Sequence, residues 1–430
     1  MGVDAAPAPE HRGWSGRQLA LLAAVVVAGA IVRIILLPVE GFRGDIDQFV
    51  VWVHGIAVNG LPRAYDQDLT FGPVMAYIWG VLAAVEPAFK TVTDASDPMI
   101  RALMRTPASV ADIGLAVLAA YALRNRPVWA IVAAAAIVFH PAVIDVTIWY
   151  SQYESIYVVL GLAALVLALD GHDRWAAVLL AAAVLTKPQA LPFVLPFVAW
   201  FWVRGGIREV ATCAAVGLAT AVVLWLPFIP FGGPGNYLQN LAHYQQDIFP
   251  VLSLRAWNLW WIVQERLAAG QFVDDQTTIL GPLSARLVGY GITVVLSLVV
   301  AAAIVRDPRP RTFVLGLAVA TLVAFCFLTT MHERYAYGAV IFLMLLVPDR
   351  RFRWLALALG IVFTLNLLAA IPPTPAIAEL IPIGGLMGLL GSVAMLSIMG
   401  VAFAWLLPRP VGERSGQDHR VAAVADAGGL

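Results

Sequence analysis

Four short polar segments interrupt a strongly apolar chain, and one further polar pair lies apart from them. The segments are residues 44–47, 149–154, 186–189 and 332–335, and the pair is Arg255 with Asn258. Ionisable side chains at membrane depth are costly, so their concentration in a few places indicates a functional site. These segments are therefore the first candidates for chemistry.

Side chains of these types could together move a group from a phosphate to a hydroxyl. A carboxylate can accept the proton of the attacking hydroxyl, and cations can hold a phosphate leaving group as its charge grows. Asp45 or Asp47 could supply the carboxylate. The candidate phosphate-binding residues are Lys187, His332, Arg334 and Arg255. The candidates for other contacts with donor or acceptor are Asp47, Gln152, Glu154, Gln189, Glu333, Tyr335 and Asn258.

Helix periodicity favours Asp45 over Asp47 as the proton acceptor. Residues 45–58 are typical of a helix, and Asp45 shares a face with Trp52, nearly two turns further on, while Asp47 points about 200° away. The alternative is that Asp45 only caps the helix. This chemistry requires no metal, and we expect no cofactor, although Asp45, Asp47 and Glu154 could host a divalent ion.

Several candidates also have a purely structural interpretation. The Lys187 amine could simply reach the membrane interface along its apolar stem. His332 and Arg334 could form an interfacial cap with Glu333. The following Pro188 interrupts an apolar stretch at Lys187, which favours a site there.

Two further charged residues lie within apolar runs. Arg33 near the end of the first run could be an anchor, and Asp112 in the middle of another run needs a partner, for which Arg105 is the nearest candidate in the sequence. We therefore expect a structural pair at Asp112 rather than catalysis.

The composition is that of an integral membrane protein. Of 430 residues, 61% are hydrophobic and only 13% are charged, which is too few for the surface of a soluble protein of this length. Apolar runs of about 18 or more residues recur, each able to cross a hydrocarbon core, and in lipid such runs must be helical. The zero net charge and the lack of a basic stripe argue against nucleic acid as a partner. The predicted class is an all-α polytopic membrane protein.

Basic clusters set the predicted orientation. They lie in alternate loops, at Arg124 and Arg126, Arg174, Arg204 and Arg208, Arg306 with Arg309 and Arg311, Arg350 with Arg351 and Arg353, and Arg409 with Arg414. Cytosolic placement of these loops puts the polar segments on the outer face and gives about 12 spans, between about 11 and 13. Residues 71–85 are then an outer-face or re-entrant helix, and residues 101–123 the second span.

Two long outer loops carry predicted amphipathic helices. The second is expected to hold an interfacial aromatic set, Trp257, Trp260 and Trp261, on a helix over residues 253–267. The predicted division is a cytosolic tail at 1–16, a catalytic membrane domain at 17–348 with outer loops at 39–100 and 230–281, C-terminal transmembrane helices at 349–407, and a disordered cytosolic tail at 408–430.

Six segments occur in a particular order along the chain. They are Asp45-Ile46-Asp47 through Trp52, residues 70–77 (TFGPVMAY), Arg105 with residues 111–113 (ADI), residues 139–153 from FHP to QY, residues 187–191 (KPQAL) and residues 332–334 (HER). In this order they resemble the GT-C superfamily of polyprenyl-phosphate-dependent glycosyltransferases. The most similar members are the dolichyl-phosphate glucosyltransferases and bacterial relatives of the second mannosyltransferase of GPI-anchor synthesis.

The resemblance implies a GT-C-like fold, with Asp45 at the position of the family's catalytic base. It implies inverting transfer of a hexose, mannose being the first expectation, from a polyprenyl-monophosphate sugar to a glycolipid, glycan or protein acceptor of the cell envelope. We expect a multi-pass protein of the plasma (inner) membrane with an extracytoplasmic active site, contacting membrane lipids and no nucleic acid. The alternative is a polytopic transporter or a lipid-linked sugar flippase, although polar residues at span ends are not typical of transporters.

Overall fold

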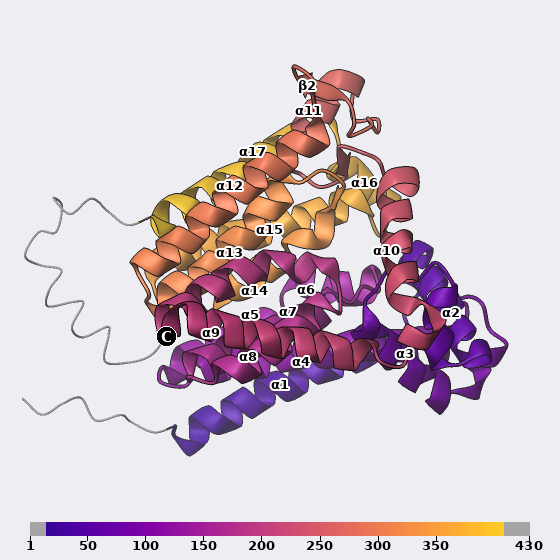
Figure 1. Cartoon of the computed structure of the whole chain (residues 1–430), viewed down its shortest axis with the longest axis horizontal. Helices are drawn as coiled ribbons and strands as arrows, with labels where there is room; N and C mark the ends of the chain where they lie inside the picture. The colour runs from indigo at the N-terminus through magenta and orange to yellow at the C-terminus, as the bar shows by residue number, and fades with distance from the viewer. Residues whose placement is uncertain (1–13, 408–430) are drawn as a thin grey trace, which may run out of the picture.

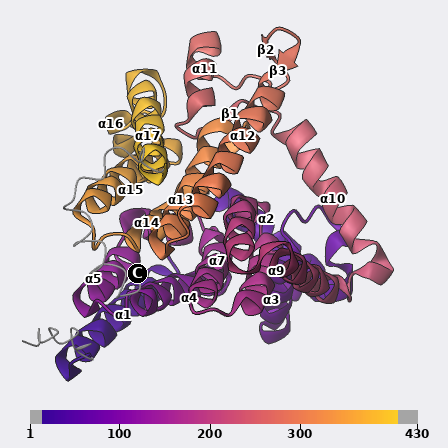
Figure 2. The ribbon, with the colours of Figure 1, turned by 60° about the vertical axis from the view of Figure 1, so that its left-hand side comes forward.

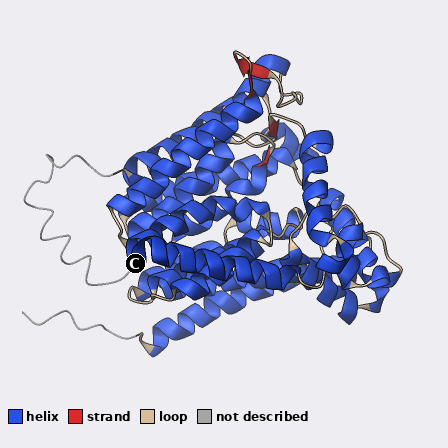
Figure 3. Ribbon diagram, in the orientation of Figure 1, coloured by secondary structure: helices blue, strands red, loops and turns tan. Residues whose placement is uncertain are grey.

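The computed structural model describes residues 14–407, and nearly every element in this range is a helix (Figures 1 and 3). The predicted all-α class is confirmed. Most of the expected N-terminal tail, and all of the expected tail at 408–430, lie outside the described residues.

The first nine helices form one half of the molecule, coloured indigo to magenta in Figure 1. Their bounds are α1 Gly16–Leu36, α2 Arg43–Asn59, α3 Pro73–Val85, α4 Pro98–Ala122, α5 Pro127–Val138, α6 Pro141–Ile144, α7 Glu154–Leu169, α8 Asp173–Val184 and α9 Val194–Trp225. α7 packs against both α4 and α8. The α4 side of the contact presents buried alanines such as Ala108 and Ala116, and small side chains allow helix backbones to approach closely.

The remaining elements form the other half. The helices are α10 Gly233–His243, α11 Leu259–Ala268, α12 Ala285–Arg306, α13 Pro310–Phe327, α14 Tyr337–Met344, α15 Arg350–Ala370, α16 Pro375–Leu380 and α17 Gly385–Leu406. The strands are β1 Ser253–Leu254, β2 Thr278–Leu280, β3 Leu283–Ser284 and β4 Met331–His332, in which β1 pairs in parallel with β4 and β2 in antiparallel with β3. In Figure 2, α10 extends from one half to the other.

Seven helical segments of the described chain are long and apolar enough to cross a membrane. They are α1, α4, the segment Pro188–Trp225 that ends in α9, α12, α13, α15 and α17, and an eighth forms if the bent pair Pro127–Val138 and Pro141–Trp149 is one span. The apolar helices α3 and α7 are shorter. The expected count of about 12 is reached only if shorter buried helices also cross, so that number stays a prediction.

Basic residues and the polar segments lie at opposite ends of shared helices. At one end of α4, Arg124 pairs with Asp170, and near that end of α13 and α15, Arg311 pairs with Asp349. At the other end of α4, Arg101 donates to the carbonyl of Pro38, in the segment that leads to α2. Figure 1 shows α2, α10 and α16 on the side away from the two chain ends. The cytosolic placement of the arginine clusters stays a prediction.

The buried ion pair of the bundle differs from the predicted one. Asp112 of α4 pairs with Arg33 of α1, at 3.1 Å, and accepts hydrogen bonds from Thr147 and from Tyr337 of α14. Arg33 is therefore no interfacial anchor. Arg105 points elsewhere, because its guanidinium is taken up by Ser151 and by the carbonyls of residues 37, 39 and 40. Proximity in the sequence suggested Arg105 as the partner of Asp112, whereas helix packing brings Asp112 together with Arg33, which lies far away along the chain.

The predicted interfacial tryptophans are core residues. Trp257, Trp260 and Trp261 are each 1% exposed, and the helix begins at Leu259 rather than at residue 253. Gly388 and Gly391 of α17 leave room for the rings of Trp261 and Trp257: a Cβ on Gly391 would lie 2.1 Å from Trp257. Trp260 packs instead beside Gly289 of α12. The expectation of an aromatic belt here is wrong because glycines on neighbouring helices make room for these rings.

Candidate functional site

Four polar segments that are remote in the sequence converge on one cavity of about 530 Å³. Asp45 comes from α2, Gln152 from the segment before α7, Lys187 from the segment after α8, and His332 and Arg334 from the end of β4 and the turn after it. The convergence of an acid with two cations, proposed from their chemistry, is present in the structure.

Asp45 lies on a face of α2 that aromatic packing anchors. Phe49 and Trp52, one and two turns further along this face, are buried and pack, with rings 5.5 Å apart, in an aromatic cluster that also contains Phe71 and Trp79. Phe42 is the N-cap of α2 and makes no side-chain cap hydrogen bond. The Asp45 carboxylate instead accepts a hydrogen bond from Gln152 and lies 3.4 Å from Arg334. Asp45 is therefore not the helix cap.

Asp47 lies on the other face of the same helix, as periodicity predicted. Its Oδ1 pairs with Arg43 at 2.9 Å and accepts a hydrogen bond from the backbone N–H of Ala95 at 2.8 Å. Asp47 is not among the residues that line the cavity. It connects α2 to the segment before α4.

Lys187 enters the cavity wall at a break between helices. Its amine is buried, 2.6 Å from Glu154 and 3.3 Å from the amide oxygen of Gln152. The backbone here is fixed by Gly72, whose N–H donates to the carbonyl of Thr186. A Cβ at Gly72 would meet the carbonyl oxygen of Leu185 at 2.1 Å, so only glycine permits this approach. Lys187 is thus an ion-pair partner in the cavity rather than a side chain that reaches the interface.

Arg334 connects three carboxylates. It lies 3.1 Å from Glu333, 3.4 Å from Glu154 and 3.4 Å from Asp45. Burial disfavours the charged guanidinium, but the carboxylates, Asp45 foremost, outweigh it and raise the pKa of Arg334. The two glutamates are almost completely buried, whereas the Asp45 side chain is 34% exposed. Of the three, only Asp45 lines the cavity, so Glu154 and Glu333, predicted as substrate contacts, instead lie behind the wall and hold Arg334.

His332 is neutral in this arrangement. Burial, followed by the positive charges of Arg334 and Lys187, lowers its pKa well below the usual value. Arg334 donates a hydrogen bond to His332 Nδ1 at 3.1 Å, and a nitrogen that accepts a hydrogen bond carries no proton. Its ring is therefore available to donate from Nε2.

Two more predicted residues complete the wall. The Tyr335 ring lies 5.5 Å from the Lys187 amine and 5.6 Å from the Arg334 guanidinium, close enough for cation–π attraction. Gln189 lines the cavity, and its amide oxygen is buried without a hydrogen-bond partner among the described residues. An unpaired buried acceptor of this kind is costly, and a ligand hydroxyl at this place would satisfy it.

Backbone strain marks the same region. Ser151, beside Gln152, has φ of 57°, and Thr330, beside Met331, has φ of 61°. The left-handed region is unfavourable for residues with a Cβ, and such strain is concentrated at functional sites. The π-helical turn Asp145–Trp149 directly precedes this strained segment. π-Helical turns, like strained residues, occur frequently at functional sites.

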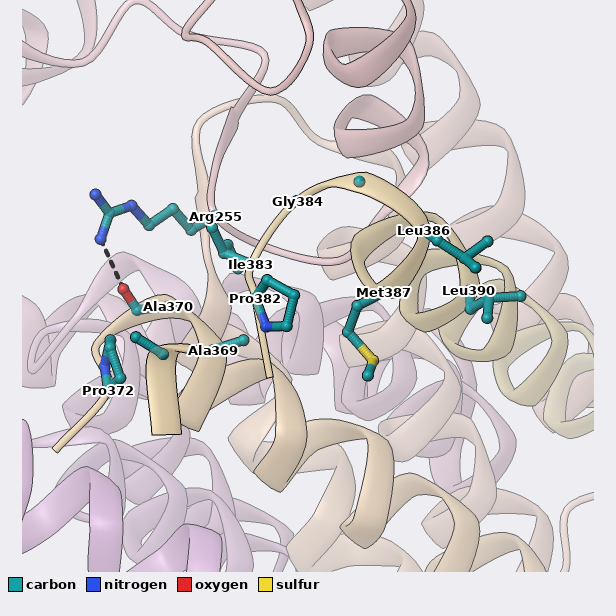
Figure 4. Close-up of a pocket in the computed structure, with 12 residues that line it drawn as sticks. Arg255, Ala369, Ala370, Pro372, Pro382, Ile383, Gly384, Leu386, Met387 and Leu390 are labelled. Atoms are coloured by element: carbon teal, nitrogen blue, oxygen red, sulfur yellow. Dashed lines mark hydrogen bonds between the residues drawn. The ribbon is translucent and has the colours of Figure 1, made fainter. Parts of the chain in front are cut away.

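Arg255 and Asn258, like Asp47, do not line the cavity. The backbone of Arg255 bridges to His332, but its side chain turns away, donates to the carbonyl of Ala370 and lines a second cavity (Figure 4). Asn258 is fully buried, caps α11 through the N–H of Trp261, and donates to the carbonyl of Phe325. The assignment of Arg255 to the donor phosphate and of Asn258 to substrate contact is therefore not supported by their positions.

Other residues line the cavity that the sequence did not single out. They are Gln48, Phe249, Tyr244, Gln245, Tyr290, Thr329 and Thr330, among others. Gln48 follows Asp45 by three residues in α2, so helix periodicity could have found it. The others come from α10 and the loops beyond it and from α12, and no local pattern connects them to Asp45.

Metal ligation was left open for Asp45, Asp47 and Glu154. Within residues 14–407, no group of three or more His, Cys, Asp or Glu side chains is arranged to hold a metal ion. Glu154 instead pairs with Lys187, and Asp47 is directed away from the cavity.

One comparison with known proteins gives a match. The model of a family described as "ALG6, ALG8 glycosyltransferase family" matches residues 71–372, which is well over half of the chain. Lys187, His332 and Arg334 lie inside the matched range, and Asp45 precedes it. No curated protein matches the chain. The assignment of Asp45 therefore depends on its geometry and on the sequence pattern around it.

Proposed function

Because the chain belongs to the ALG6, ALG8 glycosyltransferase family, we propose that its Asp45 cavity transfers a sugar, with inversion, from a polyprenyl monophosphate to a hydroxyl acceptor. The observation that carries the proposal is the meeting of one open carboxylate, Asp45, with two buried cations, Lys187 and Arg334. These three residues are far apart in the sequence, so it is a poor explanation that they came together in one cavity by chance.

The proposed reaction is a single displacement at the anomeric carbon. The acceptor oxygen forms a bond to that carbon while the bond from the carbon to the phosphate oxygen breaks, and the polyprenyl phosphate leaves. Asp45 takes the proton of the acceptor hydroxyl. Arg334 and Lys187, with a hydrogen bond from His332, stabilise the charge that develops on the departing phosphate.

The ion pairs within the cavity suggest an order to these events. Arg334 lies 3.4 Å from Oδ2 of Asp45, so this oxygen is engaged by the guanidinium until a donor phosphate takes the place of Asp45 at the guanidinium. A donor phosphate would compete with Asp45 for Arg334, while buried Glu154 and Glu333 keep the guanidinium in place. In the proposed order, the donor therefore binds first and releases Asp45 to meet the acceptor.

The sugar, the acceptor and the side of the membrane on which the cavity opens are also proposals. Mannose is the first sugar we would test, with glucose and arabinose beside it, and the acceptor is proposed to be a glycolipid, glycan or protein of the cell envelope. The location of the arginine clusters at the opposite end of shared helices favours a cavity that opens to the extracytoplasmic side of the plasma membrane.

The direct test is transfer by the purified protein in detergent from polyprenyl-phosphate sugars labelled in the sugar. We expect label to reach the acceptor from a lipid-phosphate donor and not from the matching nucleotide sugar. An Arg334→Gln variant should be inactive, and an Arg63→Gln variant, whose arginine pairs with Asp66 on the protein surface, should be fully active.

A transporter or flippase would give the opposite pattern. Sealed vesicles containing the protein would accumulate a solute or translocate the sugar lipid, with no new glycosidic bond. Transport without transfer, or equal activity of the Arg334→Gln variant, would refute the proposal.

A further inference from the structure

A second cavity, of about 900 Å³, lies outside the proposed catalytic site (Figure 4). It is formed by the C-terminal end of α15, the loop around α16 and the first turns of α17, and Arg255 reaches into it from the segment after β1. The two cavities share no lining residue. A molecule in the second cavity is therefore not placed to react at Asp45.

The cavity has a cationic end and an apolar end. In Figure 4, the guanidinium of Arg255 lies near Ala370 and Pro372, while Leu386, Met387 and Leu390 lie at the other side. Within the described residues, this guanidinium donates one hydrogen bond, from Nη1 to the carbonyl of Ala370 at 2.6 Å. Arginine has five N–H donors, so the group retains capacity to bind an anion.

The position of Arg255 is built by the surrounding structure. Its φ of 62° is in the left-handed region, which is unfavourable for a residue with a Cβ and persists only where neighbours enforce it. Fully buried Asn366 of α15 does so: its Nδ2 donates to the carbonyl of Arg255, and its Oδ1 accepts from the N–H of Trp257. An arginine that merely reached for solvent would need no such support.

The surroundings of the cavity are those of a membrane surface. α15 and α17 are both candidate spans, and the cavity lies at the ends of these helices that are remote from Arg350 and Arg351. Leu386 is 73% exposed and Leu390 is 58% exposed. Large exposed leucines on a spanning helix contact acyl chains, and an arginine at the interface attracts lipid phosphate.

We propose that this cavity binds an anionic phospholipid of the surrounding bilayer, with its phosphate on Arg255 and one acyl chain along Leu386, Met387 and Leu390. The lipid also supports the catalytic cavity. Arg255 directly follows Leu254, which pairs with His332 in the contact of β1 with β4, so a phosphate that fixes Arg255 also fixes the wall that carries His332. Sugar transfer is therefore stimulated by anionic lipid.

Lipid retention tests the proposal independently of enzyme activity. The protein would be purified in neutral detergent, mixed with equal amounts of phosphatidylglycerol and phosphatidylcholine, and examined by native mass spectrometry. The wild type should retain phosphatidylglycerol, and Arg255→Gln should lower its affinity about tenfold or more, the usual effect of losing a charge-assisted hydrogen bond. The matched control is Arg266→Gln, which removes an exposed arginine of α11 outside the cavity.

A second pair of variants tests the apolar end without touching the arginine. Leu390→Trp should fill the groove and displace the lipid, whereas Leu380→Trp, at an exposed leucine that does not line the cavity, should not. Equal retention of the two phospholipids by the wild type, equal retention by Arg255→Gln, or equal loss in Arg266→Gln would overturn the proposal. Displacement of phosphatidylglycerol by an equimolar polyprenyl phosphate would also overturn it, because the occupant would then be the carrier lipid.

Discussion

At the scale of single residues, the charges of the catalytic cavity form one connected network. Lys187 and Arg334 each contact Glu154, and the same cations reach Asp45, one through Gln152 and the other directly. Removing one partner of a buried ion pair leaves an uncompensated charge, whereas removing both does not. The network therefore allows stability and function to be separated by paired substitutions.

Lys187→Met should abolish donor binding and destabilise the protein. Loss of a buried partner costs roughly 3–5 kcal/mol, and less is expected here because Arg334 still contacts Glu154. The double variant Lys187→Met with Glu154→Gln should regain thermal stability without regaining transfer. Lys90→Met, at an exposed lysine, is the control. Normal donor affinity in Lys187→Met would show that this amine does not hold the phosphate.

His332 should make the stability of the protein depend on pH. Burial and the charges of Arg334 and Lys187 lower its pKa well below the usual value of about 6.5 in the folded state, whereas in the unfolded chain its pKa is near that usual value. The unfolded state therefore binds more protons below about pH 6.5, so stability is lost as the pH falls through this range. The thermal unfolding temperature between pH 7 and pH 5 should fall less steeply in His332→Gln. Exposed His172 serves as the control, and an unchanged slope in His332→Gln would contradict a neutral buried imidazole.

At the scale of elements, periodicity predicted local geometry but not packing partners. The opposite directions of Asp45 and Asp47 followed from α2 alone, and the spans at α1 and α4 followed from apolar length. The Arg33–Asp112 pair could not be predicted in this way, because it depends on how α1 lies against α4. For the same reason, the sequence did not reveal that the side chain of Arg255 leaves the cavity in which His332 lies.

The glycine face of α17 gives an element-scale prediction. Gly391→Ala would place a Cβ 2.1 Å from the Trp257 ring, and such overpacking costs roughly 1–3 kcal/mol. Gly400→Ala is the matched change in the same helix, with no atom within 4 Å of the new Cβ, and it should be neutral or stabilising by up to about 1 kcal/mol. Thermal unfolding in detergent would compare them, and equal stability of the two variants would contradict the tight contact of Trp257 with α17.

At the scale of the whole molecule, the site depends on contacts between the two halves. Asp45, Gln152 and Lys187 belong to the first half, and His332 and Arg334 to the second. Composition predicted the class, and motif order predicted part of the membership of this site, because five of the six motifs contribute lining residues. The motif of Arg105 with residues 111–113 contributes none. The shape of the cavity could not be predicted, since α10 and α12 contribute lining residues through packing alone.

The most direct measurement compares Asp45→Asn with Asp47→Asn, a matched pair two residues apart on opposite faces of α2. Donor affinity and the rate of sugar transfer would be measured for each purified variant with a polyprenyl-phosphate sugar. Loss of a general base typically lowers the rate by about 10²- to 10⁴-fold, so Asp45→Asn should bind the donor and fail to transfer the sugar, while Asp47→Asn should transfer it at a near-normal rate. Undiminished transfer by Asp45→Asn, or an equal loss in Asp47→Asn, would contradict the assignment of Asp45 as the base.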